Sequence, residues 1–289
     1  MTDDPFVTHR GLLFTVAYEM LGSAADAEDV VQETWLRWAG VDPGVVREPR
    51  AYLVRIVTRQ ALNRLRSLAR RREDYIGEWL PEPLLTSPDV AEDVELAESV
   101  SIAMLTVLET LGPTERAVFV LREVFEAPYD DIADAVGKTP AAVRQIAHRA
   151  RQHVAARRPR MRVDRAEQRA ATEKFMAALS TGDLQGLLDV LAPDVVLISD
   201  GGGVVRAARR PITGGATVAM VLTTAVNRMS RFEISGVWLN GALGARIDVD
   251  GELGAAVGLT VENGRITRIL TIGNPHKLSW LATEANLAR

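Results

Sequence analysis

The sequence predicts a multidomain protein in which two all-α parts precede a C-terminal α+β part. Up to about residue 160 the apolar residues recur with the period of an α-helix, and no stretch alternates convincingly. After residue 165, four strand-like stretches are separated by Asn240-Gly241, Asp250-Gly251 and Asn263-Gly264. Asn-Gly and Asp-Gly favour tight hairpins because both turn positions tolerate a positive φ. We therefore expect helices packed on a curved antiparallel sheet in the last third of the chain.

The composition is that of an ordinary globular protein, with 47% hydrophobic and 25% charged residues among 289. Cysteine is absent and the four histidines show no metal-ligand spacing, so we expect neither a metal nor a cofactor. The acidic start and the lack of a long apolar run indicate neither a secretory signal nor a membrane span. We therefore expect a cytoplasmic protein.

The net charge of −4 hides two strongly basic blocks. Residues 47–72 contain Glu48 as their only acid, and residues 138–163 contain no acid. Two basic blocks in an acidic protein indicate two separate surfaces for a polyanion rather than a general affinity for one.

A first amphipathic helix is expected over residues 24–38, after a capping pattern of Ser23 and Asp26. The face expected to lie toward the core carries Ala27, Val30, Val31, Thr34 and Trp38. The opposite face is acidic with one leucine, and consists of Asp29, Gln32, Glu33 and Leu36. This second face is either an ordinary solvated surface or a docking surface for a basic partner.

A second amphipathic helix is expected over residues 51–72, with an apolar stripe opposite a basic one. The basic stripe consists of Arg55, Arg59, Asn63, Arg66 and Arg70. Guanidinium groups at this spacing suit backbone phosphates, and an asparagine among them can read a base edge. Because few acids are nearby to pair with them, nucleic-acid contact is favoured over a merely solubilising face.

Residues 127–154 have the pattern of a helix-turn-helix. Gly137 is placed to end the first helix, Thr139 to cap the second, and Pro140 to occupy its first position. The inward face of the second helix would consist of Val143, Ile146, Ala147, Ala150 and Val154. The outward face would carry Ala141, Arg144, Gln145, His148 and Gln152, flanked by Arg149 and Arg151. Such a helix suits a major groove, with the flanking arginines on phosphates; the alternative is a helical hairpin that merely has a basic second helix.

An acidic segment that contains two prolines separates the basic blocks, and no lysine or arginine occurs between Glu73 and Glu115. Pro81 and Pro83 favour an extended path of low entropy, which would deliver Trp79 to a fixed place. The alternative is that this segment is a plain spacer.

In this order, these pieces resemble an extracytoplasmic-function sigma factor of the sigma-70 family. Residues 26–38 look like the region-2 helix that grips the clamp helices of the RNA polymerase β′ subunit, and the segment through Arg72 looks like the part that reads the minus-ten element. Residues 108–124 with the helix-turn-helix look like region 4, which reads the minus-thirty-five element and contacts the β flap. The resemblance implies core RNA polymerase and promoter DNA as partners, and it does not require an anti-sigma factor.

The resemblance assigns roles to the three exposed faces. The residues expected to contact polymerase are Asp29, Gln32, Glu33 and Leu36. Those expected to serve the minus-ten element are Arg55, Arg59, Asn63 and Arg66. Those expected to serve the minus-thirty-five element are Arg144, Gln145 and His148, with Arg149 and Arg151 beside them.

Three motifs narrow the resemblance to the subgroup with a fused C-terminal SnoaL-like domain, a cone-shaped α+β fold: WLPEP (79–83), DGGG (200–203) and NPHKL (274–278). Two positions depart from the subgroup pattern, since Val204 stands for a lysine and His276 for an aspartate. Any ionic contact made by those two positions would therefore be altered. The expected domains are region 2 (1–74), an acidic linker (75–98), region 4 (99–160) and the SnoaL-like domain (164–289).

In that subgroup the fused domain is thought to restrain regions 2 and 4 in a compact arrangement. We therefore expect the linker to dock on the C-terminal domain near its two motif loops, and the acids after Pro83 to shield the basic faces. The residues expected in this contact are Trp79, Leu80, Pro81, Glu82 and Pro83 with Asp200, Gly201, Gly202, Gly203, Asn274, Pro275, Lys277 and Leu278.

The C-terminal domain has three alternative uses: an interaction module, a sensor for a small ligand, or an enzyme of the cyclase or isomerase type with a helical accessory domain that binds DNA. An enzyme would need a carboxylate as general base, for which the candidates are Asp194, Asp200 and Asp248. The sequence places no histidine or tyrosine partner beside them. We expect a non-enzymatic protein with no catalytic residue, because only fold analogy supports catalysis.

Overall fold

The computed structural model describes residues 4–73, 75–157, 165–229 and 231–289, without the side chains of residues 43 and 69–73. The expected domain boundaries near residues 74 and 160–164 and the side chain of Arg70 lie outside the described residues. None of the described helices is both long and apolar enough to cross a membrane.

The chain begins with antiparallel helices that bury the expected apolar faces. The Asp4 carboxylate accepts from the Phe6 N–H at the first helix, which ends where Gly22 adopts a φ of 66°. All five residues predicted to lie on the inward face of the second helix are buried. The elements are α1 (Pro5–Leu21), α2 (Ala24–Trp38), the short 3-10 helix η1 (Pro43–Val45) and α3 (Pro49–Glu73).

The helix-turn-helix is confirmed in detail. Gly137 has a φ of 68°, and the Thr139 hydroxyl accepts from the Ala142 N–H. The predicted inward residues of the second helix are all buried. The elements of this part are α4 (Pro88–Glu92), α5 (Val94–Val100), α6 (Ile102–Leu108), α7 (Pro113–Phe119), η2 (Val120–Val124), α8 (Tyr129–Val136) and α9 (Pro140–Arg157).

The last third is the predicted α+β part. Its three hairpin turns have the expected positive φ at Asn240 (52°), Asp250 (54°) and Asn263 (53°). The elements are α10 (Arg165–Thr181), α11 (Leu184–Val190), β1 (Leu191–Asp200), β2 (Ile212–Thr213), α12 (Gly215–Val226), β3 (Phe232–Leu239), β4 (Ala242–Val249), β5 (Glu252–Glu262), β6 (Arg265–Ile272), α13 (Pro275–Leu278) and η3 (Ser279–Ala282).

The described strands form one sheet in the order β2-β1-β6-β5-β4-β3. β3 to β6 form the predicted antiparallel meander, whereas β1 pairs with β6 in parallel. The sheet is therefore not purely antiparallel. The chain leaves β1, passes through α12 and the first strands of the meander, and returns beside β1 as β6, running in the same direction.

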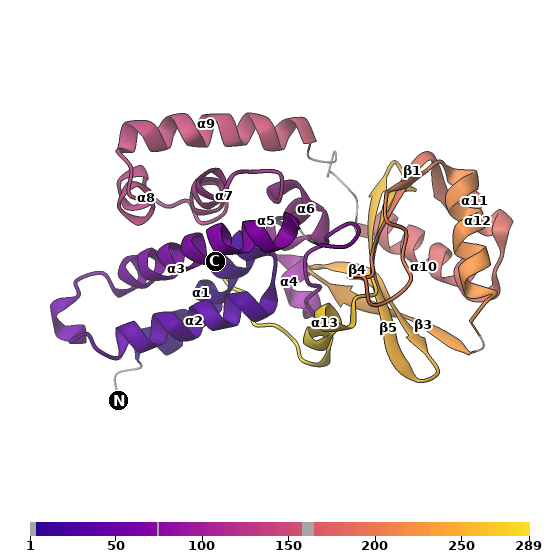
Figure 1. Cartoon of the computed structure of the whole chain (residues 1–289), viewed down its shortest axis with the longest axis horizontal. Helices are drawn as coiled ribbons and strands as arrows, with labels where there is room; N and C mark the ends of the chain where they lie inside the picture. The colour runs from indigo at the N-terminus through magenta and orange to yellow at the C-terminus, as the bar shows by residue number, and fades with distance from the viewer. Residues whose placement is uncertain (1–3, 74, 158–164, 230) are drawn as a thin grey trace.

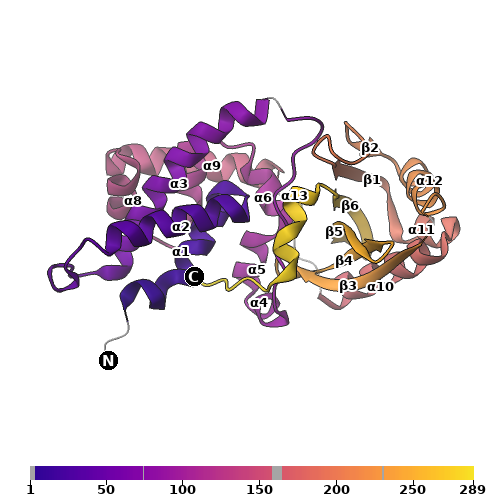
Figure 2. The ribbon, with the colours of Figure 1, turned by 60° about the horizontal axis from the view of Figure 1, so that its bottom comes forward.

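Both faces of this sheet are covered, and this explains how the domain joins the rest of the chain. α10, α11 and α12 cover one face (Figure 1), around buried Phe175 and Leu187. The other face packs against residues from outside the domain, among them Leu80 of the linker and Ile102 of α6. Leu278 of α13 closes the same cluster. Seen from a second direction, α13 lies between the sheet and the helical part of the molecule (Figure 2).

Candidate functional site

The basic stripe of α3 is only partly open to solvent. Asn63 and Arg66 are exposed. Arg55 is half-buried, and its guanidinium lies 5.3 Å from the centre of the Tyr52 ring. Arg59 is exposed but donates from Nη2 to the backbone carbonyl of Asp134 in α8, at 2.6 Å. One predicted DNA contact of α3 is therefore occupied by the helix-turn-helix.

The outward face of α9 is exposed at every position predicted to contact DNA: Arg144, Gln145, His148, Arg149 and Arg151. Arg144 lies 5.5 Å from the Tyr129 ring centre, and Arg151 is 3.7 Å from the Glu123 carboxylate. Both interactions are at the surface, where they are weak and readily exchanged for a phosphate.

The acidic face of α2 is exposed as predicted, including Leu36 at 61%. Two of its members already have partners on α3. Asp29 pairs with Arg64, and the Glu33 carboxylate accepts from the Gln60 amide at 3.0 Å. α2 and α3 are thus locked to one another in the helical part, with Gln32 and Leu36 open to an incoming partner.

The two candidate DNA-binding parts are packed together. α3 lies against α7 and α8 (Figure 1), and buried residues from α1 to α9 share one hydrophobic cluster. A cleft of about 440 Å³ runs between the start of α3 and the helix-turn-helix, lined by Arg55, Leu121 and Asp134 among others. The stripe of α3 and the outward face of α9 cannot move apart without opening this packing.

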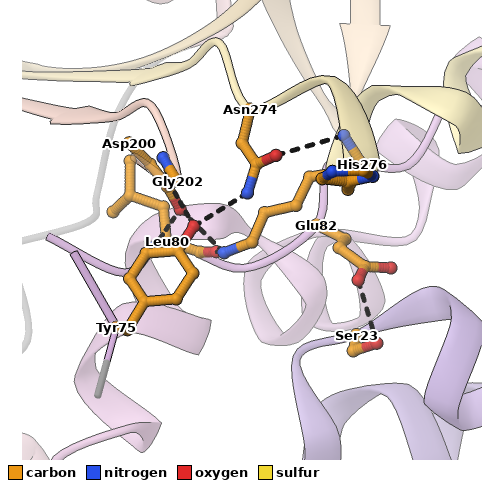
Figure 3. Close-up of polar contacts among 9 residues, drawn as sticks. Ser23, Tyr75, Leu80, Glu82, Asp200, Gly202, Asn274 and His276 are labelled. Carbon is orange, nitrogen blue, oxygen red and sulfur yellow. Dashed lines mark hydrogen bonds and ion pairs between the residues drawn. The ribbon is translucent and has the colours of Figure 1, made fainter. Parts of the chain in front are cut away.

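The WLPEP segment lies against both motif loops of the C-terminal domain (Figure 3). The Leu80 N–H donates to Asp200 Oδ2 at 2.9 Å, and Lys277 Nζ donates to the same oxygen at 2.7 Å and to the Leu80 carbonyl. Tyr75 donates its hydroxyl proton to Asp200 Oδ1 and accepts from the Asn274 amide at 2.9 Å. Asp200 thus binds the linker and the NPHKL loop at once.

The Asp200–Lys277 pair is among the most buried charges of the described chain, with side chains 0% and 7% exposed. Removing either partner would leave an uncompensated charge in the interior. The Lys277 ammonium also lies 4.1 Å from the Trp79 ring centre, a cation–π contact. Val204 and His276, the two departures from the subgroup motifs, are both exposed. The buried ionic contact between the two loops uses the neighbouring Lys277.

Glycines make this close approach possible. A Cβ on Gly202, which has a φ of 60°, would stand 2.2 Å from the Asn274 amide nitrogen. A Cβ on Gly22 would stand 2.8 Å from the Trp79 ring. Trp79 therefore lies between Lys277 of the C-terminal domain and the turn that joins α1 to α2.

Glu82 fastens the linker to the start of α2. Its carboxylate accepts from the Ser23 hydroxyl at 3.0 Å and from the N–H groups of Ala24 at 2.7 Å and Ala25 at 3.2 Å. It therefore caps the helix that carries the candidate polymerase face. Burial raises the pKa of Glu82, and the hydrogen bonds from Ala25, Ser23 and Ala24 oppose that rise.

Asn240 joins three parts of the chain through one buried side chain. Its Oδ1 accepts from the Leu84 N–H at 2.9 Å, and its Nδ2 donates to the Tyr18 hydroxyl at 2.7 Å and to the Val100 carbonyl at 2.8 Å. Tyr18 in turn donates to the Glu82 carbonyl at 2.6 Å. The β3–β4 hairpin is therefore bonded to α1, to the linker and to the end of α5.

The C-terminal arm, residues 283–289, runs back from the sheet to α1 (Figure 2). The Ala288 N–H donates to the Thr15 hydroxyl at 3.0 Å, and Leu287 is buried in the helical cluster. Arg289 pairs with Asp93 and Glu95. Asp93 and Glu95 follow Pro83 and were expected to shield the basic faces. They instead bind the C-terminal arm, because Arg289 pairs with both.

The three carboxylates considered as a general base lie in three different environments, none of which resembles a catalytic site. Asp200 is held by the contacts above. Asp248 is paired with Arg246, whose hydrogen bonds hold the pKa of that carboxyl below its usual value. Asp194 is exposed on β1. In the described residues these three carboxylates do not converge on one cavity.

Several residues of the interdomain contact could not be found from the sequence. Tyr75 precedes the WLPEP motif and carries no pattern of its own, and Asn240 looked like a turn residue only. The sequence analysis gave Tyr18 no role. The available signal for Asn240 was the hairpin turn, which explains its backbone but not its side chain.

Comparisons with known proteins agree with this arrangement. Sequence models of Sigma-70 region 2 and of Sigma-70 region 4 match residues 6–71 and 101–154. The chain is 38% identical to the ECF RNA polymerase sigma factor SigJ of Mycobacterium tuberculosis, covering 95% of this chain and 92% of that protein. It is 34% identical to the probable ECF RNA polymerase sigma factor SigI of the same organism, covering 96% and 94%. The crystal structure of M. tuberculosis SigJ matches with a TM-score of 0.77 at 34% identity, over 96% of this chain and 98% of that chain.

Proposed function

The chain belongs to the extracytoplasmic-function RNA polymerase sigma factor family, and we propose that its C-terminal domain holds the promoter-binding helices closed in the free protein. The chain is similar to sigma factors over nearly its whole length, the SnoaL-like domain included. Because these relatives are named as sigma factors and not as enzymes, we assign no catalysis to that domain. The protein would act in the cytoplasm, where RNA polymerase is located.

The residue roles in this proposal follow the exposed faces. Core RNA polymerase would dock on the acidic face of α2, with its clamp helices against Gln32 and Leu36. Promoter DNA would meet Asn63 and Arg66 of α3 at the minus-ten element, and Arg144 and His148 of α9 at the minus-thirty-five element. Region 2 would correspond to residues 1–74 and region 4 to residues 99–160, with the remaining DNA and polymerase contacts on the same faces.

The hydrogen bond from Arg59 to the Asp134 carbonyl is the observation that carries the proposal. It links Arg59, a proposed minus-ten contact of region 2, directly to the helix-turn-helix of region 4. Because two promoter boxes lie apart on the DNA, the two parts must separate before both can be read. The closed arrangement is therefore unable to bind both boxes, and Arg59 becomes available for DNA only when α3 leaves α8.

The linker would transmit the restraint from the C-terminal domain. Its Leu80 is fixed by Asp200 and Lys277, and its Glu82 is fixed to the start of α2. As long as both ends of this short segment are bound, region 2 stays on the C-terminal domain. A polymerase that grips α2 would shift the equilibrium by its differential affinity for the open arrangement.

Distance measurements between α3 and α9 test this proposal. The chain has no cysteine, so Ser67→Cys and Gln152→Cys, both at exposed positions, introduce two dye sites for energy transfer. We expect high transfer in the free protein and a fall when core polymerase and a promoter fragment are added. We also expect Lys277→Met to lower transfer in the free protein and to raise promoter-directed transcription.

The matched control is Lys174→Met, which alters an exposed lysine on α10. The proposal is wrong if polymerase and promoter leave the transfer unchanged. It is also wrong if Lys277→Met matches the control in both transfer and transcription.

A further inference from the structure

A second cavity lies at the junction of α5 and α6 with the sheet. It measures about 490 Å³, within the range of small-molecule sites. One wall comes from α5 and α6, where Ala97, Ile102 and Ala103 line it, and the other comes from the strands, where Trp238 and Leu259 line it. It is thus shared between the end of the linker, the start of the region-4 match and the C-terminal domain.

Small residues on both walls keep this space open. Ala97 and Ala103 stand where the helices could carry larger side chains, and Gly244 and Gly258 stand opposite on the strands. A Cβ on Gly258 would lie 3.2 Å from the Ile102 side chain, so α6 and β5 are already in direct contact beside the hollow. Leu259 and Val261 of β5 line the hollow and also belong to the cluster around Phe175, so the cavity ends where that cluster begins.

The rim of the cavity carries charge and hydrogen-bond donors, while the interior is mostly apolar. The first turns of α10 contribute Arg165, Gln168 and Arg169, and α5 contributes Glu98. Arg169 pairs with Glu173 on its own helix at 2.9 Å, and both side chains of this pair are exposed. Such a surface ion pair is weak, so Arg169 can exchange Glu173 for an anionic ligand, with the exposed Arg165 one turn away. An apolar interior beneath two exposed guanidinium groups fits a molecule with an apolar body and one anionic group.

We propose that this junction cavity binds a small, largely apolar organic acid, with its body between α6 and the sheet and its acidic group toward Arg165 and Arg169. The walls belong to parts that separate if the closed arrangement opens. Resting on the proposed function, binding here would then favour the closed arrangement. The ratio of closed to open protein would rise by the factor 1 + [L]/Kd, about tenfold at a ligand concentration of ten Kd.

Two fluorescent probes with the same apolar skeleton test the site in the full chain. 8-Anilinonaphthalene-1-sulfonate carries one anionic group and N-phenyl-1-naphthylamine carries none. We expect the parent chain to bind both. Val94→Trp would place an indole at the mouth of the cavity, since Val94 lines it and is 64% exposed, so folding should be unaffected. This variant should weaken both probes about tenfold, a loss of roughly 1.4 kcal/mol.

Each variant has a matched control outside the cavity. Val7→Trp adds the same indole at a position on α1 that is 68% exposed. Arg169→Gln should weaken the anionic probe about threefold to tenfold and leave the neutral probe within about twofold, whereas the exposed Arg228→Gln should change neither. If Val94→Trp matches Val7→Trp, or if Arg169→Gln weakens both probes alike, the assignment is overturned.

A last measurement links the cavity to the closed arrangement. Decanoate should displace the anionic probe, raise energy transfer between α3 and α9, and lower promoter-directed transcription in the parent chain but not in Val94→Trp. No displacement by decanoate would overturn the assigned ligand class. Displacement without a change in transfer would overturn the coupling. The proposed function is judged separately, by the response of the Lys277→Met variant without any ligand.

Discussion

Replacing Asn240 by alanine should open the closed arrangement by removing the side chain that joins three parts of the chain. Asn240 is 0% exposed, and its amide serves Leu84, Tyr18 and Val100. After the substitution, the Leu84 N–H and the Val100 carbonyl lose this partner while still buried. Each unsatisfied buried group costs about 1–3 kcal/mol, so the closed arrangement should lose about 2–6 kcal/mol.

The loss should appear in the closed-to-open equilibrium, because both backbone groups regain water when the β3–β4 hairpin leaves the linker. About 2–6 kcal/mol corresponds to a factor of roughly 30 to 20,000 in that equilibrium. Energy transfer between labels on α3 and α9 measures the opening, and transcription from a cognate promoter measures its consequence. We expect low transfer without polymerase and higher basal transcription.

Asn263→Ala is the matched control, because it isolates the backbone contribution. Asn263 occupies the same position of an Asn-Gly hairpin turn and has a φ of 53°, against 52° for Asn240, but its side chain is exposed. Both variants suffer the strain of alanine in a left-handed conformation, about 1–2 kcal/mol. If Asn240→Ala opens the protein no more than Asn263→Ala does, the hairpin is not a restraint and the reasoning fails.

Three further outcomes are expected. Asp200→Asn and Lys277→Met should each loosen the linker contact and lower the free energy of unfolding. The double variant should lower it by at least about 1 kcal/mol less than the sum of the two single losses, because it leaves no unpaired buried charge. Additive losses in this double-mutant cycle would contradict the reasoning. Arg144→Ala should weaken binding of polymerase-loaded protein to the minus-thirty-five element by about 1–3 kcal/mol, whereas Lys174→Ala should not, as measured by promoter titration at fixed salt. Glu19 is buried, and burial raises its pKa to about 8, opposed by the Ser99 hydroxyl and by Arg116. The folded state keeps a proton on Glu19 that the unfolded state releases from about pH 4.5 upward. The free energy of unfolding that protonated Glu19 contributes is therefore fully present below the unfolded pKa, and it is lost as the pH rises through about 8. Glu19→Gln should therefore flatten this fall in urea-unfolding free energy between those pH values, and an unchanged pH profile would show that Glu19 ionises normally.

The sequence alone predicted the structure correctly where the preferences of one helix or one hairpin determine it. The period of apolar residues in 24–38 placed Val30, Val31 and Trp38 inward, and they are buried. Gly137 and Pro140 bounded the helix-turn-helix because each has a local conformational reason to be there. The Asn-Gly and Asp-Gly turns likewise gave the meander from local preference.

Long-range pairings were beyond that reasoning. Nothing in the sequence around Leu191 indicates that β1 pairs in parallel with β6, since both strands are simply apolar. The motifs located the contact between the linker and the two loops, but not its chemistry. Lys277 and Asp200 form a buried ion pair because glycines let the loops approach, and the capping of α2 by Glu82 depends on where the linker lies in space.

The order of the restraining residues along the chain has a consequence for protein synthesis. Asp200, Asn240, Lys277 and Arg289 all lie downstream of the helices that they restrain. A ribosome therefore exposes α1 to α9 before it has made any of these partners. At roughly 5–20 residues per second, residues 165–289 take about 6 to 25 seconds to translate. On the proposed function, each nascent chain would during that interval carry its candidate DNA-binding helices without the contacts that hold them closed. The speed of elongation over the last third would then set how long a newly made molecule stays open.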